Sequence, residues 1–187
     1  MKLKDKLIFR FNKWRYQTSP ISFYNALLKP RRLLITLPFD VNDHRLCADI
    51  IELLKRRFEP QELKFTHTRF PAGKTADLTR GYQVIYPELS QISKSEVPGK
   101  EYLDKVCSFM PKIAIDLDST ASPYNSLIIL KSGASARIGL QRGIGLPYYN
   151  LEVKSSKGAT TIQRYQDYHK FLDNYFNWSE LQVESEV

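Results

Sequence analysis

The chain has 187 residues, which is long enough for one domain with a sizeable hydrophobic core but short for two full α/β domains. Its apolar content of 42% and aromatic content of 12% exclude a disordered chain. The formal charge of +8 is unevenly distributed: residues 1–32 carry nine basic residues and one acidic residue, whereas residues 33–187 carry nineteen of each. Because the body is neutral, we expect no nucleic-acid partner.

The sequence also lacks the signals of several other classes of protein. Every apolar run is shorter than the ~20 residues that cross a bilayer, and the N-terminus has no uninterrupted apolar segment typical of a signal peptide. Cys47 and Cys107 lie in apolar helical patterns without a CxxC or metal-like spacing, which predicts reduced core thiols in a cytoplasmic protein. No phosphate-binding glycine loop, nucleophile elbow or metal motif is present, so we predict neither a cofactor nor a metal site.

Residues 1–32 form a basic arm that begins with a predicted amphipathic helix. Leu3, Leu7, Phe11 and Trp14 recur at helical spacing on one face, while Phe9 lies among the charges. The helix could pack against the protein's own sheet, or it could lie on an anionic membrane surface, and both alternatives stay open. A second apolar patch at 22–28 extends the same surface. On the membrane alternative the protein is peripheral on the inner membrane, and the contacting residues are Lys6, Arg10, Lys13, Trp14, Arg31 and Arg32.

Residues 33–178 are predicted to form an α/β domain with a single doubly wound, Rossmann-like parallel sheet. Near-continuous apolar runs indicate strands that are covered on both faces. The final residues, 179–187, are acidic and are expected to form a flexible tail. Strands are expected at 33–37, 63–67, 83–86, 112–118 and 136–140, the strand–helix–strand unit closes with residues 148–153, and helices are expected at 44–58, 102–109, 123–131 and 161–178.

Polar residues collect where the predicted strands end. Asp43 follows the first strand, Asp118 ends the strand at 112–118, and Ser119 follows it. Because open α/β sheets bind ligands at the carboxyl ends of their strands, these residues mark a candidate site. Asp43 also suits the N-cap of the following helix. His67, with no Ser, Cys or carboxylate patterned near it, is predicted to be solvated or hydrogen-bonded rather than catalytic.

Three segments, "IDLDS", "SGASARIGL" and "PYYNLEV", together resemble the N-terminal, acceptor-side domain of the heptosyltransferase-like family of bacterial glycosyltransferases, the ADP-heptose:lipopolysaccharide transferases of family 9. The resemblance covers about residues 32–178 and is most specific over residues 113–153. It implies a domain similar to one half of a GT-B glycosyltransferase. In that family the donor nucleotide sugar is bound mainly by a second domain, across a cleft from the acceptor.

The resemblance places Asp43 at the position of the family's proposed general base. Two departures fall in the same loop: Asn42 stands where the family has glycine, and Phe39 and Asp40 replace small hydroxyl residues. We therefore expect a degenerate module, inactive alone, that acts as a binding or scaffold subunit with another protein chain at the cytoplasmic membrane face. The alternative is the acceptor-binding half of a split glycosyltransferase of lipopolysaccharide or cell-surface glycan synthesis, with Asp43 as base and a separate chain binding the nucleotide sugar. On either hypothesis the cleft residues are Asp40, Asn42, Asp118, Ser119 and Arg137.

Overall fold

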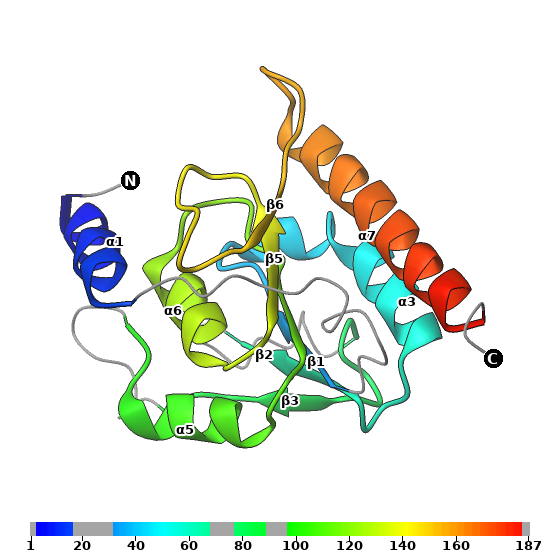
Figure 1. Cartoon of the computed structure of the whole chain (residues 1–187), viewed down its shortest axis with the longest axis horizontal. Helices are drawn as coiled ribbons and strands as arrows, with labels where there is room; N and C mark the ends of the chain where they lie inside the picture. The colour runs from blue at the N-terminus through cyan, green and yellow to red at the C-terminus, as the bar shows by residue number, and fades with distance from the viewer. Residues whose placement is uncertain (1–2, 17–31, 68–76, 89–96, 185–187) are drawn as a thin grey trace.

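The computed structural model describes residues 3–16, 32–67, 77–88 and 97–184, with side chains described as far as Asn177. Within these ranges, six strands form one sheet in the order β3-β2-β1-β4-β5-β6, and every neighbouring pair is parallel. The predicted doubly wound α/β fold is confirmed (Figure 1). The strands are β1 (Leu33–Thr36), β2 (Leu63–Thr66), β3 (Gln83–Ile85), β4 (Ile113–Asp116), β5 (Ala136–Leu140) and β6 (Leu151–Val153).

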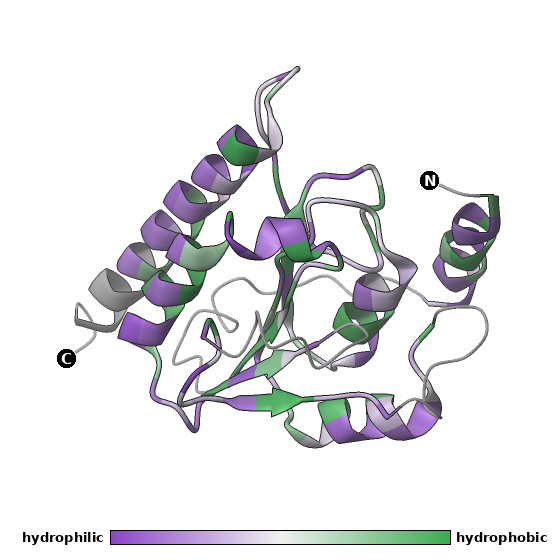
Figure 2. Ribbon diagram, turned by 180° about the vertical axis from the view of Figure 1, so that it is seen from behind, coloured by the Kyte–Doolittle hydropathy of each residue, from purple (hydrophilic) through white to green (hydrophobic). Residues whose placement is uncertain are grey.

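Helices cover both faces of this sheet because successive strand residues point to opposite sides. Leu33 and Ile35 face a core formed with α3 (Ala48–Arg57) and α7 (Thr161–Glu184). Leu34 faces a second core, formed with α5 (Lys100–Ser108), α6 (Pro123–Lys131) and α1 (Leu3–Arg15). Figure 2 shows hydrophobic colour concentrated in the central strands, which are buried between the two layers.

Several predicted boundaries need correction. The helix expected at 44–58 is a 3₁₀ helix, η1 (Val41–His44), followed by α3. The final helix does not end near 178 but continues to Glu184, so residues 179–184 belong to the helix. The apolar patch at 22–28 and Arg31 lie outside the described residues.

The N-terminal helix α1 packs on the body in an unexpected orientation. Phe9, the apolar residue that the helical wheel places among the charges, is buried against Tyr148, with ring centroids 5.1 Å apart and nearly perpendicular. The predicted apolar face, formed by Leu3, Leu7, Phe11 and Trp14, is exposed instead. Among the described residues, no helix combines the length and apolar character needed to span a membrane.

Candidate functional site

The order of the strands defines where a ligand would bind. From β1 the chain steps outward to β2 and β3, and then returns to place β4 on the other side of β1. The connections that follow β1 and β4 therefore leave the sheet in opposite directions. The carboxyl edge of the sheet between these two connections is the topological switch point, where doubly wound sheets bind ligands.

Asp43 lies in the connection after β1, on the inner side of η1. Asp40 caps this 3₁₀ helix, because its carboxylate accepts a hydrogen bond from the backbone N–H of Asn42 at 2.9 Å. Asp43 is thus not the N-cap that its position in the sequence suggested. Its side chain turns inward instead, and the residue is only 9% exposed.

The carboxylate of Asp43 joins the two connections at the switch point. Its Oδ2 accepts a hydrogen bond from the Ser119 hydroxyl, which lies after β4, and a second from the Tyr165 hydroxyl of α7 at 3.2 Å. Its Oδ1 accepts no hydrogen bond from the residues that the structure describes. One carboxylate oxygen is therefore occupied, and the other is available as an acceptor.

Asp116 ends β4 and organises the floor of the site. It is fully buried, and its carboxylate forms an ion pair of 2.8 Å with Arg142, whose side chain is only 3% exposed. A carboxylate that accepts this many hydrogen bonds has little capacity left for a ligand, so its role is to hold the strand ends together. The other donors to it are Thr36 Oγ1 at 2.8 Å, Tyr149 Oη at 2.5 Å, Asn125 Nδ2 at 3.3 Å and the backbone N–H of Asp118 at 3.0 Å.

Arg142 is the residue of this region that sequence reasoning missed. Its guanidinium donates to the backbone carbonyls of Asp118 at 2.9 Å and Thr120 at 2.7 Å, and it lies 4.8 Å from the centre of the Tyr149 ring. Arg142 therefore fixes the path of the chain after β4, which carries Asp118 and Ser119. The available signal was a basic residue two positions after a buried strand, beside a strand that ends in an acid.

Asp118 is fully buried next to this ion pair. Its Oδ1 accepts hydrogen bonds from the backbone N–H of Thr120 at 3.0 Å and from the Thr120 hydroxyl at 2.9 Å. Burial, reinforced by the negative charge of Asp116, raises the pKa of Asp118 from 3.8 to about 6, although Arg142 opposes the shift. Asp118 therefore exchanges its proton in a mildly acidic range.

The structure brings Asp43 and Ser119 into contact, and Asp118 is the residue before Ser119 in the same connection. Asp40 and Asn42 are exposed on the outer side of η1, at the rim of the site. Arg137 is not at this edge. Arg137 is the second residue of β5, two positions before Gly139, which pairs with Asp116 at the end of β4. Its side chain donates to the backbone carbonyls of Tyr148 at 3.1 Å and Ala134 at 3.0 Å. Its contacts are those of a residue that positions the 148–150 segment.

Two histidines lie near the same edge of the sheet. His67, directly after β2, is 4% exposed, and its ring stands edge-on to that of His44 at 5.9 Å. Within the described ranges neither ring nitrogen of His67 has a hydrogen-bond partner, so the expectation of a solvated or hydrogen-bonded histidine is not met there. Burial, with a contribution from the charge of His44, lowers the pKa of His67 to about 4. His67 is therefore neutral at physiological pH.

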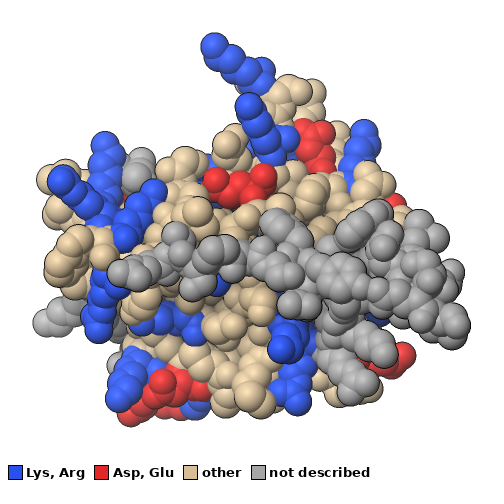
Figure 3. All heavy atoms as spheres, in the orientation of Figure 1, with Lys and Arg blue, Asp and Glu red and all other residues tan. Residues whose placement is uncertain are grey.

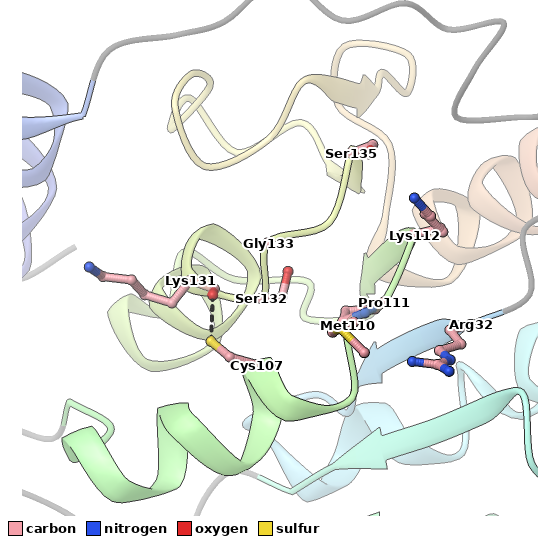
Figure 4. A pocket seen from close by; sticks show the side chains of 9 residues that line it. All are labelled: Arg32, Cys107, Met110, Pro111, Lys112, Lys131, Ser132, Gly133 and Ser135. Carbon is pink, nitrogen blue, oxygen red and sulfur yellow. Dashed lines mark hydrogen bonds between the residues drawn. The ribbon is translucent and has the colours of Figure 1, made fainter.

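A separate cavity of about 520 Å³ lies at the opposite, amino edge of the sheet (Figure 4). Arg32 and Lys112 reach it from the starts of β1 and β4. Cys107 lies on its wall and donates from Sγ to the backbone carbonyl of Lys131 at 2.8 Å. Cys107 is half-buried rather than in the core, whereas Cys47 is fully buried as expected. Arg32 thus lies at this cavity, and it donates to the carbonyl of Phe109 at 3.2 Å.

No protein-family model, curated protein or solved structure matches this chain. Within the described ranges, no three His, Cys, Asp or Glu side chains converge to hold a metal ion.

The close packing around Asp116 predicts that Gly139 is intolerant of a side chain. A Cβ at this position would lie 2.8 Å from Cδ1 of Tyr149, a ring that is fixed by its hydrogen bond to Asp116. We expect Gly139→Ala to lower the free energy of unfolding by about 1–3 kcal/mol, the usual cost of overpacking, as measured by urea denaturation. In a Tyr149→Leu background, which removes the ring edge, the same substitution should cost less. Equal costs in both backgrounds would contradict this account.

Proposed function

We propose that this chain is a glycosyltransferase-like binding module that takes a carbohydrate ligand at the switch point and transfers no sugar by itself. The observation that carries the proposal is the hydrogen bond between Ser119 and Asp43, which links the connections after β1 and β4 at the switch point. Groups from both sides of the switch point thereby lie in one place, which is the arrangement in which doubly wound sheets receive ligands.

The chemistry of the site supports a ligand rich in hydroxyl groups. A sugar needs acceptors for its hydroxyl protons, and Oδ1 of Asp43 is an anionic acceptor without a partner among the described residues. The exposed side-chain amide of Asn42 at the rim offers both donors and an acceptor. The resemblance of residues 113–153 to family 9 glycosyltransferases supports the same class of ligand.

The environment of Asp43 supports binding without catalysis. A general base must approach the acceptor hydroxyl and take its proton. Here Ser119 and Tyr165 already occupy Oδ2, which leaves only Oδ1 for the ligand. A base at Oδ1 achieves transfer only when a donor sugar is held at attack distance, and the family that the sequence resembles binds its donor mainly on a second domain. We propose that the module therefore acts as an accessory or scaffold subunit together with another protein chain.

The proposal predicts a carbohydrate affinity that depends on Asp43. We expect the purified chain to bind a lipid-free lipopolysaccharide inner-core oligosaccharide in calorimetry. Asp43→Asn should bind it about tenfold more weakly or worse, because a charged hydrogen bond is replaced by a neutral one. Asp104→Asn, which changes an exposed carboxylate on α5, is the matched control and should leave the affinity unchanged.

The same protein, supplied with ADP-heptose and the oligosaccharide, should yield no transfer product. Equal affinities of wild type and Asp43→Asn would refute the assignment of the site. Transfer by the chain alone would refute the non-catalytic role.

A second candidate function is favoured by the free Oδ1 of Asp43. In a split glycosyltransferase this oxygen would accept the proton of the acceptor hydroxyl, while a partner chain holds the nucleotide sugar close enough for attack. The two functions separate in a complex isolated with its native partner. Transfer by that complex, lost in Asp43→Asn while assembly is retained, would establish the split enzyme in place of the scaffold.

A further inference from the structure

The outward face of α1 carries an apolar stripe that nothing in the described structure covers. Leu3, Leu7, Phe11 and Trp14 are 75%, 60%, 55% and 82% exposed. They follow one another at intervals of four, four and three residues, which places them along one side of the helix. We call these four residues the α1 stripe.

The orientation of the stripe follows from how α1 is attached. Phe9 is 5% exposed and packs on Tyr148, while Asp5, Ile8 and Asn12 on the same side are partly buried. Since this side faces the body, the stripe points away from it. α1 lies at one end of the molecule beside α6, at the opposite end from α7 (Figure 1). The stripe can therefore reach a flat surface without obstruction by the described part of the fold.

A single exposed apolar side chain needs no explanation, but a contiguous row of four does. The other large apolar side chains that the structure leaves exposed are spread over separate elements rather than grouped on one helix face. They are Phe39, Val41, Tyr86, Met110, Leu146 and Ile162.

The charges of α1 indicate what covers the stripe. The helix carries five basic side chains and one acidic one, Asp5, which lies on the side facing the body. Figure 3 shows Lys and Arg side chains gathered over α1 at the end of the molecule. The basic residues flank the stripe along both of its edges: Lys6, Arg10 and Lys13 on one, Lys4 and Arg15 on the other.

We propose that α1 lies in the plane of an anionic bilayer, with the α1 stripe inserted at the boundary between headgroups and acyl chains. Its basic flanks would then contact anionic lipid headgroups. An anionic bilayer has apolar acyl chains below a layer of negatively charged headgroups. A helix that lies in its plane therefore needs an apolar row with cations along both edges, as α1 has. Phe9 transmits this attachment to the body through its contact with Tyr148. The proposal does not depend on the ligand at the switch point.

Vesicle binding by the full chain tests the proposal. Trp178→Phe leaves Trp14 as the only tryptophan, so fluorescence reports the stripe directly. With vesicles of equimolar phosphatidylcholine and phosphatidylglycerol, Trp14 emission should shift to the blue. With phosphatidylcholine alone, the partition coefficient should be far lower.

Two matched pairs of variants separate the contributions of apolar contact and charge, with co-sedimentation as the measurement. Leu7→Gln/Phe11→Gln should reduce partitioning about 100-fold, whereas Met110→Gln/Ile162→Gln, which alters exposed apolar residues elsewhere, should not. Lys6→Gln/Lys13→Gln should reduce it about 30-fold, at roughly one kcal/mol per cation. Lys154→Gln/Lys157→Gln removes the same charge from the body and should have little effect.

Three results would overturn the proposal. One is the absence of binding to anionic vesicles, and another is binding that survives Leu7→Gln/Phe11→Gln. The third is self-association in light scattering that this variant abolishes, since a second copy of the chain would then cover the stripe. No sugar is present in these assays, so their failure leaves the proposed carbohydrate site untouched.

Discussion

Replacing Arg142 by methionine is expected to lower the free energy of unfolding by about 3–5 kcal/mol. The substitution leaves the Asp116 carboxylate fully buried without its countercharge, and it removes the donors to the carbonyls of Asp118 and Thr120. The loss would be measured by urea denaturation at neutral pH.

A surface ion pair of nearly the same length provides the control. Arg80 and Asp77 lie 2.7 Å apart, but their side chains are 82% and 79% exposed, against 3% and 0% for Arg142 and Asp116. Because exposed pairs contribute little, Arg80→Met should change stability by less than about 0.5 kcal/mol. Asp116→Asn/Arg142→Met should recover part of the loss, since no unpaired charge remains buried. A double variant as unstable as Arg142→Met would contradict the electrostatic explanation.

Two buried groups are expected to give the protein opposing pH dependences between pH 4 and 7. The pKa of Asp118 is raised to about 6, so the folded state holds a proton that the unfolded state has released, and stability falls as the pH rises. The pKa of His67 is lowered to about 4, so the unfolded state holds the extra proton, and stability rises with pH. Each contribution amounts to about 2–3 kcal/mol over this range, and in the wild type they largely cancel.

Removing either group should expose the contribution of the other. As the pH rises from 4 to 7, the free energy of unfolding of Asp118→Asn should increase by about 2–3 kcal/mol relative to the wild-type curve. That of His67→Phe should decrease by a similar amount. Asp104→Asn, which alters an exposed carboxylate, should follow the wild-type curve. Urea denaturation at intervals of one pH unit measures all four proteins. Parallel curves for the two buried-site variants would contradict the assigned shifts.

The sequence was sufficient to predict the sheet and part of the site, because both depend on local patterns. Apolar runs such as Ile113-Ala114-Ile115 mark strands that are buried on both faces. The carboxyl ends of such strands meet at one edge. Asp43, Asp118 and Ser119 could therefore be placed together before any contact was known.

The remaining features depend on register and packing, which no local pattern specifies. Arg142 and Asp116 are 26 residues apart in the sequence. They come into contact because the register of β4 and β5 places Gly139, three residues before Arg142, opposite Asp116. Tyr165 reaches Asp43 from a helix 122 residues further along the chain. Arg137 was assigned to the cleft by resemblance, but its place near the start of β5 directs it to backbone carbonyls instead.

Helix α1 illustrates the same limit. The helical wheel correctly grouped Leu3, Leu7, Phe11 and Trp14 on one face. It did not indicate which face of the helix packs against the body of the protein. Phe9 packs on Tyr148, and because this side of α1 faces the body, the larger apolar face points outward.

Whether a carbohydrate binds at the switch point is measured by an amide-resolved NMR titration of the full chain with the lipid-free inner-core oligosaccharide. We predict saturable chemical-shift changes in the connections after β1 and β4, over residues 38–45 and 117–122, and none around the amino-edge cavity at 131–135. In Asp43→Asn the changes over residues 38–45 and 117–122 should need about tenfold more oligosaccharide or should not appear. Shifts confined to the amino-edge cavity, or an unchanged spectrum at saturating oligosaccharide, would contradict a carbohydrate site at the switch point.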